Sequence, residues 1–204
     1  MERTYTVFHK EKTLKINNEQ LSKFASHVRL NKSYRDRVSE LLILNLFVYS
    51  IEFGINPREV IEEIENLESG DGNTQTKPAE EFTRPPLAGL WHKHFFTARF
   101  LPKNILNSLQ GGVLDNLVNE IMDPSKSSII TEEMISELAH RVINEPVRQR
   151  SNSNKLTGEW IIFAKKGSKN YYLCLSTHDA GDDFIAEQIR DHCVRDFPFL
   201  SDYV

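Results

Sequence analysis

The sequence predicts an α+β protein, in which a helical N-terminal layer precedes a C-terminal domain of helices packed on a β-hairpin or small antiparallel sheet. Residues 156–164 and 171–178 are rich in aromatic and β-branched residues, and a short polar segment containing Gly167 separates them. This pattern is typical of a β-hairpin. Residues 1–68 instead carry most of their apolar residues at helical spacing. The chain therefore combines a helical part with a part built on strands.

The N-terminal region, residues 1–68, begins with a predicted β-ribbon. Residues 4–8 and 13–16 alternate between polar and apolar side chains around a charged turn. Asn17 and Asn18 then provide an N-cap signal for a first helix, in which apolar residues recur at a helical interval.

Two further helices are predicted before residue 70. One starts near Ser33 and ends at Gly54, and Asn45 is the one polar residue inside its apolar run. A helix that is apolar nearly all round is usually buried, so this helix is the predicted centre of the N-terminal core. The next helix starts at Pro57 and ends at Gly70.

Residues 69–86 are polar and rich in Gly, Pro, Asn and acidic residues, so we expect a linker here. The C-terminal domain then covers residues 87–204. Its predicted helices are residues 87–101, a segment from Pro102 to Met122 that Gly111 and Gly112 interrupt, a helix capped by Thr131 that Pro146 ends or kinks, and a last helix opening at Asp182 or Asp183.

The composition sets limits on function. The net charge of -4 and the pI of about 6.0 give no overall basic surface for nucleic acid. Residues 1–37 do contain nine Lys or Arg against four acids, which we interpret first as a set of solvated helices with complementary charges and second as a local nucleic-acid-binding patch. The two cysteines, Cys174 and Cys193, are expected to be buried free thiols. With no apolar leader and no membrane-spanning run, we expect a soluble cytoplasmic protein without membrane contacts.

The segment from Trp91 to Arg99 is the densest cluster of polar and aromatic residues. If it is helical, His92 and Arg99 project onto the same flank, while His94 falls in the apolar arc as a core residue. An imidazole that moves a proton beside a guanidinium that holds an anion suits phosphate chemistry. The alternative is structural, with Arg99 paired to an acid and His92 bonded to backbone.

A metal site is the second interpretation of the same segment. His92 and His94 would point about 200° apart on a helix and could share an ion only if the segment were extended. His178, Asp179 and the acids at the start of the last helix could then supply further ligands. We expect the helix, and therefore neither a metal nor a cofactor.

The predicted hairpin carries apolar residues on both faces, so polar function is expected only at its ends. Glu159 and His178 should lie near the same end, because residues equally distant from the turn face one another. Lys93, Glu159 and Tyr171 are the candidates for substrate binding. The sequence contains no phosphate-binding glycine loop, zinc-finger spacing or His-Glu-x-x-His motif.

The strand Leu156-Thr157-Gly158-Glu159-Trp160, with Tyr171-Tyr172 and His178, resembles blocks in short uncharacterised bacterial proteins, over residues 87–200 at most. A looser similarity is to small bacterial ribonuclease toxins of the RelE and EndoU kind. That resemblance implies His, Arg and hydroxyl residues mounted on a helix-plus-sheet core, and RNA as the substrate.

Two functions are therefore predicted. The first is a toxin-like, metal-independent ribonuclease, in which Arg99 holds the scissile phosphate while His92 and His178 act as base and acid. The second is a non-enzymatic interaction module, in which the N-terminal helices form a homodimer or bind a protein partner and the histidines are core residues.

Overall fold

The computed structural model describes residues 3–9, 12–70, 74, 76–96, 105–106, 109–125, 127, 129–152, 159–177 and 179–204. The chain forms two compact units. Unit 1 comprises residues 1–73, 78–95 and 159–204, and unit 2 comprises residues 74–77 and 96–158. We call residues 96–158 the insert, because they interrupt unit 1 between two neighbouring strands. The architecture is mixed α+β, as the sequence predicted.

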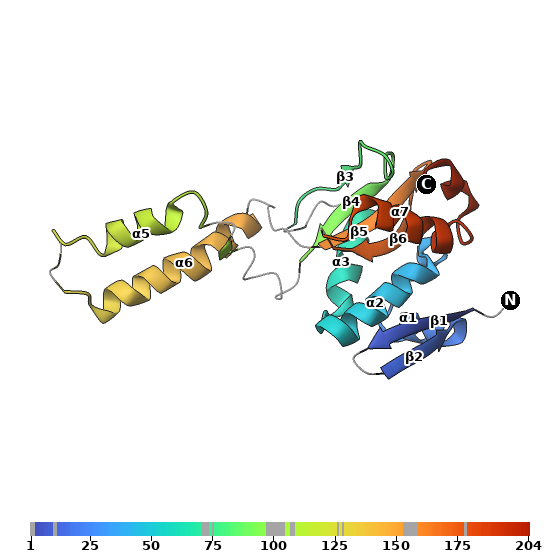
Figure 1. Cartoon of the computed structure of the whole chain (residues 1–204), viewed down its shortest axis with the longest axis horizontal. Coiled ribbons are helices and arrows are strands. Elements are labelled where there is room, and N and C mark those ends of the chain that lie inside the picture. The colour runs from blue at the N-terminus through green and yellow to red at the C-terminus, as the bar shows by residue number, and fades with distance from the viewer. Residues whose placement is uncertain are drawn as a thin grey trace. The chain divides into compact units, whose positions relative to one another are not determined.

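The main sheet of unit 1 has four antiparallel strands in the order β3-β4-β5-β6 (Figure 1). These are β3 (Glu80–Glu81), β4 (Trp91–Phe95), β5 (Glu159–Lys166) and β6 (Lys169–Ser176). The predicted hairpin is confirmed as β5 and β6, whose register joins Trp160 to Ser176 and Lys166 to Lys169. Ile161, Ile162, Phe163 and Ala164 are all fully buried, so both faces of the hairpin are covered, as expected.

Helices cover the sheet on both sides. Helix α2 (Glu40–Phe53) lies along the edge strand β6, and α3 (Pro57–Ser69) packs against β4 on one face. On the other face, the C-terminal segments α7 (Asp182–Gln188), η3 (Ile189–Cys193) and η4 (Pro198–Asp202) contribute Ile185, Ile189 and Leu200 to the main core cluster.

The N-terminal elements follow the predicted order. The ribbon is β1 (Thr4–His9) paired with β2 (Lys12–Asn17), and α1 (Asn18–His27) follows with Asn17 as its N-cap. The second helix begins later than expected, because Ser39 caps α2 and residues Arg35–Arg37 form the short helix η1. Gly54 and Gly70 end α2 and α3, as predicted, and both adopt left-handed conformations.

The prediction that residues 87–101 form a helix is wrong over its described part, residues 87–96. Trp91–Phe95 is the strand β4, which pairs with β5 along its whole length. The sequence of this segment fits either the 3.6-residue period of a helix or the two-residue period of a strand. Pairing with the buried strand β5 favours the strand. The expected linker of residues 69–86 also carries structure, because Glu80–Glu81 forms the edge strand β3 and Phe82 exchanges backbone hydrogen bonds with Leu90 and Gly89.

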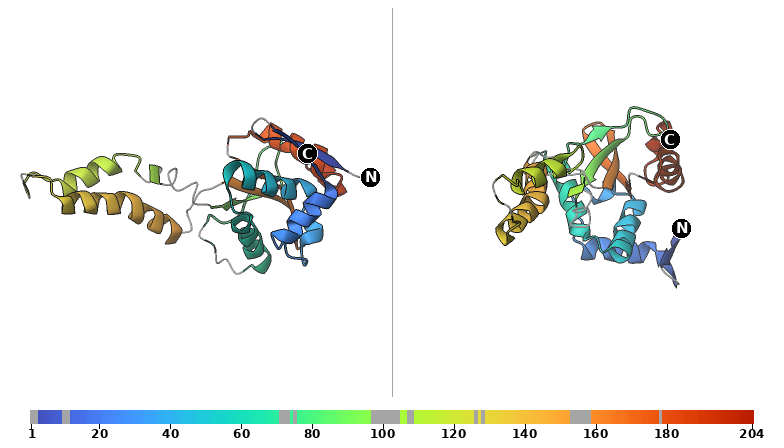
Figure 2. Two further views of the ribbon diagram at one scale, coloured as in Figure 1. Left: turned by 90° about the horizontal axis from the view of Figure 1, so that it is seen from below. Right: turned by 60° about the vertical axis from the view of Figure 1, so that its left-hand side comes forward.

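The insert contains a helical hairpin. Helices α5 (Val113–Ile121) and α6 (Glu132–Asn152) lie antiparallel and side by side (Figure 1 and Figure 2). Arg141 and Glu120 join them through hydrogen bonds of 2.8 and 3.2 Å. The predicted end at Pro146 is not observed, since α6 continues to Asn152. The division of the chain also differs from the expected one, in which residues 1–68 and residues 87–204 are separate. The N-terminal helices and the hairpin of β5 and β6 both belong to unit 1.

Candidate functional site

The two histidines of β4 lie on one face of the sheet. Because β4 is a strand, His92 and His94 point the same way, and their ring centroids are 5.7 Å apart. Trp160 on β5 lies 5.0 Å from the His92 ring, and Phe82 lies 4.6 Å from it. His92 Nε2 is 4.0 Å from Glu80 Oε2 on the edge strand. We call Glu80, Phe82, His92, His94 and Trp160 the histidine cluster.

The predicted alignment of His92 and Arg99 on one side of a helix is wrong. His92 and Arg99 were expected to project onto one helical flank, but the segment that contains His92 is a strand. Arg99 and His178 lie outside the described residues, so their predicted roles stay predictions. His94 is buried, as expected of a core residue, although it lies in a sheet.

The condition set for the metal interpretation, an extended segment, is met in β4. Within the described parts of the chain, however, no group of three or more His, Cys, Asp or Glu side chains is arranged to hold a metal ion.

Lys93, a predicted substrate-binding residue, points to the opposite face. Its side chain is only 2% exposed, and its Nζ lies 3.4 Å from Glu63 Oε2 on α3. Burial lowers the pKa of Lys93, and the charge and hydrogen bond of Glu63 oppose that shift. Lys93 is therefore a structural residue that joins α3 to the sheet, and its side chain cannot reach a substrate in solvent.

Glu159 and Tyr171 lie toward opposite ends of the hairpin. Glu159 pairs with Phe95 at the start of β5, whereas Tyr171 pairs with Ala164 near the turn. Five residues of strand separate these positions, which is about 17 Å. The Tyr171 ring packs against Phe197 and Phe199, with centroid distances of 5.2 and 4.9 Å. The prediction that both residues bind one substrate is not supported by this arrangement.

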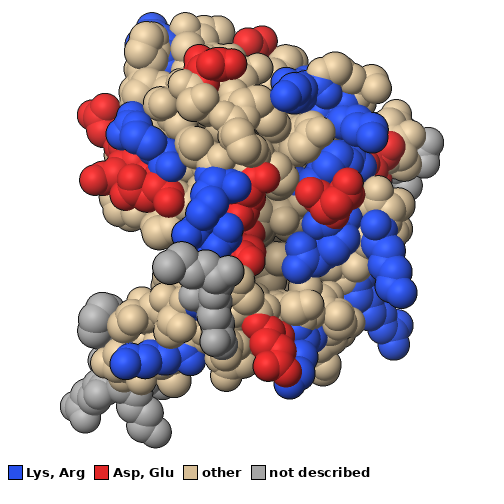
Figure 3. Space-filling view, turned by 90° about the vertical axis from the view of Figure 1, so that its right-hand side faces the viewer, with Lys and Arg blue, Asp and Glu red and all other residues tan. Residues whose placement is uncertain are grey.

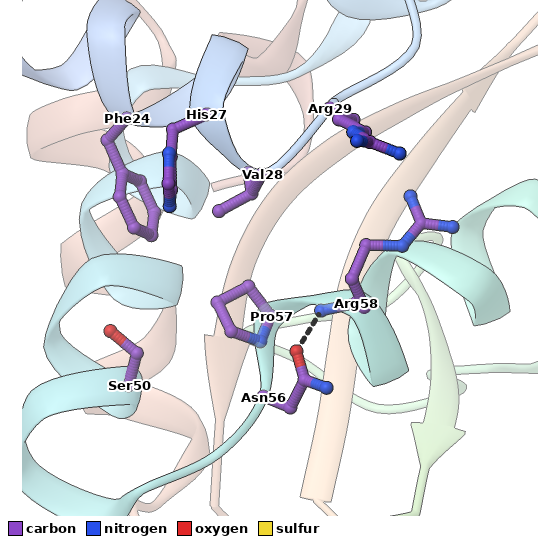
Figure 4. A pocket seen from close by; sticks show the side chains of 8 residues that line it. All are labelled: Phe24, His27, Val28, Arg29, Ser50, Asn56, Pro57 and Arg58. Carbon is purple, nitrogen blue, oxygen red and sulfur yellow. Dashed lines mark hydrogen bonds between the residues drawn. The ribbon is translucent and has the colours of Figure 1, made fainter.

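The sequence did not point to a cavity of about 550 Å³ in unit 1. It is lined by residues of α1 and the segment after it, of α2, and of the start of α3: Phe24, His27, Val28, Arg29, Ser50, Asn56, Pro57 and Arg58 (Figure 4). We call it the basic pocket. Arg29 has a positive φ of 58° directly after the C-cap of α1, a position where glycine is usual. In the sequence, the one sign of this pocket is that an arginine, and not a glycine, follows the end of the first helix.

The insert exposes the other feature that sequence reasoning missed. Of the nine large hydrophobic side chains found exposed among the described residues, seven belong to the insert. They are Leu106, Val113, Leu114, Ile129, Ile130, Ile135 and Ile143. Helix α5 buries none of its residues. In the sequence, the sign of this surface is that the apolar residues of α6 cover a wider arc than one neighbouring helix can bury.

The charges on unit 1 are mixed. Figure 3 shows one face on which Lys and Arg side chains lie among Asp and Glu side chains. Several of these charges are paired, for example Arg3 with Glu40 at 2.7 Å and with Asp196 at 2.6 Å. The basic excess of the N-terminal sequence is therefore partly neutralised by other segments of the fold.

None of the helices that the structure describes is both long enough and apolar enough to span a bilayer. Comparisons of the chain with protein-family models, with curated proteins and with solved structures gave no significant match.

Proposed function

We propose that this protein is a non-enzymatic interaction module that forms a homodimer through the helical hairpin of its insert. The observation that carries the proposal is the exposed apolar stripe Ile135, Ala139 and Ile143 on α6. Ile135 is 54% exposed and Ile143 is 50% exposed. The same class of function was predicted from sequence, but with the N-terminal helices as the interacting surface, and two of those helices, α2 and α3, pack against the main sheet.

The apolar arc of α6 is wider than α5 can cover. At about 100° per residue, Met134, Leu138 and Val142 form one edge of the arc and the stripe of Ile135, Ala139 and Ile143 forms the other. The first three are half-buried, while the stripe is exposed. The two edges together span about 180°, so α6 is suited to packing against two helices. Helix α5 is one of them, and we propose that the second comes from a partner.

The stripe is symmetric about its centre, which favours a second copy of this chain as the partner. Ala139 is small and lies four residues from an isoleucine on either side. If two α6 helices cross antiparallel at Ala139, Ile135 of each subunit lies beside Ile143 of the partner subunit. A two-fold interface requires such self-complementarity, and a small central residue allows the helices to approach closely.

The test is the mass of the chain in solution, measured by light scattering after size-exclusion chromatography. We expect about twice the 23.6 kDa of one chain. Ala139→Arg should shift the protein to a single-chain mass, because it introduces an unpaired charge at the centre of the interface. Glu137→Arg is the matched control: it adds the same side chain to an exposed position on the opposite side of α6, and should remain dimeric. A single-chain mass for the unsubstituted protein would refute the proposal.

A ribonuclease is the second candidate, and one observation favours it. The His92 imidazole lies 4.0 Å from the Glu80 carboxylate on the sheet, and these two groups could exchange a proton if they approached to hydrogen-bond distance. The test is cleavage of RNA in the presence of a chelator, with His92→Ala, Arg99→Ala and His178→Ala. The proposal predicts at least about a hundredfold loss for each histidine variant. Unchanged cleavage in both histidine variants would exclude this mechanism.

A further inference from the structure

The basic pocket of unit 1 brings cationic groups from two separate elements to one cavity. Figure 4 shows the guanidinium groups of Arg29 and Arg58 on the same side of the pocket, with the rings of Phe24 and His27 toward the other side. The volume of about 550 Å³ is within the range of small-molecule sites, about 300 to 1,000 Å³. The pocket therefore has a cationic end and an aromatic end.

Arg29 is held in the pocket by an unusual backbone conformation. Its N–H donates to Ser26 O at 3.1 Å, and Leu30 N–H donates to Ala25 O at 3.0 Å, which is the glycine-type ending of a helix. A side chain with a Cβ is disfavoured at such a position, where φ is 58°. Among the described residues, no carboxylate forms an ion pair with Arg29. An arginine thus occupies a strained position without an acidic partner.

The other side of the pocket is the start of α3. Asn56 caps this helix by accepting a hydrogen bond of 3.0 Å from the Arg58 N–H. The N-terminal end of a helix favours a nearby negative charge. The Arg58 guanidinium also approaches Glu65 at 3.4 Å and Glu62 at 3.8 Å, and its side chain is 38% exposed. These long contacts leave the guanidinium able to turn toward an anion in the pocket.

The apolar wall gives the pocket room for more than an anion. Phe24 is half-buried and packs edge-on against Phe47, with a centroid distance of 5.4 Å, while Val28 and Pro57 complete the wall. The Phe24 ring, held by this contact, presents a fixed surface to an organic group.

We propose that the basic pocket binds the phosphate monoester of a small organic molecule. Arg29 and Arg58 hold the phosphate through charge-assisted hydrogen bonds, and the organic group packs against Phe24, Val28 and Pro57. This site lies within unit 1 and is independent of dimerisation through the insert.

The test is isothermal titration of the full-length protein with three probes: AMP, inorganic phosphate and adenosine. We expect AMP to bind more tightly than inorganic phosphate, and adenosine to give no measurable binding. Equal binding of AMP and phosphate would contradict the assignment of the organic group. No binding of either phosphate-containing probe at millimolar concentration would overturn the whole proposal.

Arg29→Gly separates binding from folding. Glycine removes the guanidinium but suits the positive φ, so the melting temperature should stay the same or rise. AMP affinity should fall by about tenfold or more, and Arg58→Gln should weaken it similarly. Lys32→Ala is the control, because Lys32 is exposed, carries the same charge and does not line the pocket. Unchanged AMP affinity in Arg29→Gly, or an equal loss in Lys32→Ala, would refute the site.

Discussion

Lys93 and Glu63 form a buried ion pair between the sheet and α3, with side chains only 2% and 12% exposed. Such a pair contributes little net stability, but it becomes costly when one partner is removed, because a buried charge is then left without its counter-ion. Glu63→Leu should lower the free energy of unfolding by about 3–5 kcal/mol. The double variant Lys93→Met/Glu63→Leu should recover most of that loss. Urea denaturation of the parent, both single variants and the double variant measures this, and a double variant no more stable than Glu63→Leu would contradict the interpretation.

Glu68 makes unit 1 sensitive to acid. Its carboxylate accepts hydrogen bonds from Arg37 Nη1 at 2.9 Å and from the Tyr172 hydroxyl at 2.7 Å, which joins η1, α3 and β6. Burial opposes its ionisation, but the bonds from Arg37 and Tyr172 outweigh burial and hold the pKa of Glu68 below its ordinary value. The charged form is thus favoured by folding. Its contribution to stability is present above the unfolded-state pKa of about 4.3, and is lost as pH falls through the lower folded-state pKa.

We therefore expect the melting temperature of the parent protein to fall as the pH drops below about 4.3. Glu68→Gln should be less stable at pH 7 and should lose less on acidification. Glu19→Gln is the control, since the Glu19–Lys23 pair is exposed and should contribute little. Acid profiles that run parallel in the parent and Glu68→Gln would show that this carboxylate is not responsible.

Among the elements, the edge strand β6 explains why the otherwise apolar run of α2 contains Asn45. Strand β6 is an edge strand, and α2 with the residue before it supplies polar partners to its backbone. The Ser39 N–H donates to Tyr172 O at 2.9 Å, and the Asn45 side chain accepts from Leu175 N–H at 3.0 Å. Asn45 interrupts the apolar run of α2 because it satisfies this donor.

Asn45→Leu should lower the free energy of unfolding by about 1–3 kcal/mol, because a buried backbone N–H loses its acceptor. Ser50→Ala on the same helix is the comparison. The Ser50 hydroxyl bonds only to Phe47 O within α2, so its loss should cost less. Denaturant titration of both variants distinguishes them, and equal losses would argue against the role given to Asn45.

The elements that could be predicted from sequence are those whose signals are local. Asn17, Gly54, Pro57 and Gly70 mark helix ends by their own chemistry, and those ends are confirmed within a residue or two. Strand β4 could not be predicted in the same way. Its five residues fit a helix or a strand, and the choice depends on pairing with β5, which lies more than sixty residues later in the chain. The error at β4 then invalidated the predicted helical pair of His92 and Arg99.

Candidate sites were harder to predict than elements for the same reason. Lys93 was a candidate for substrate binding, but its partner Glu63 is on α3 and distant in sequence. The basic pocket also joins α1 to α3, so no single stretch of sequence contains it.

In the molecule as a whole, the insert joins β4 to β5 at a point where a short turn would be enough to connect the two strands. Phe95 at the end of β4 pairs directly with Glu159 at the start of β5, so a tight turn could join them. Replacing residues 96–158 with Asn-Gly should leave unit 1 folded, with cooperative thermal unfolding. The shortened protein should also be monomeric. Loss of cooperative unfolding would show that unit 1 depends on the insert, and a persistent dimer would place the interface elsewhere.

Position-specific disulfide formation tests whether two copies of α6 cross antiparallel at Ala139. In Ala139→Cys the two introduced thiols would lie within disulfide distance across the two-fold axis. The native thiols of Cys174 and Cys193 are buried and should not compete. Mild oxidation should give a covalent dimer in Ala139→Cys but not in Glu137→Cys, whose side chains would face away from the partner. Absence of cross-linking in Ala139→Cys, or equal cross-linking at the two positions, would show that the two helices do not cross at Ala139.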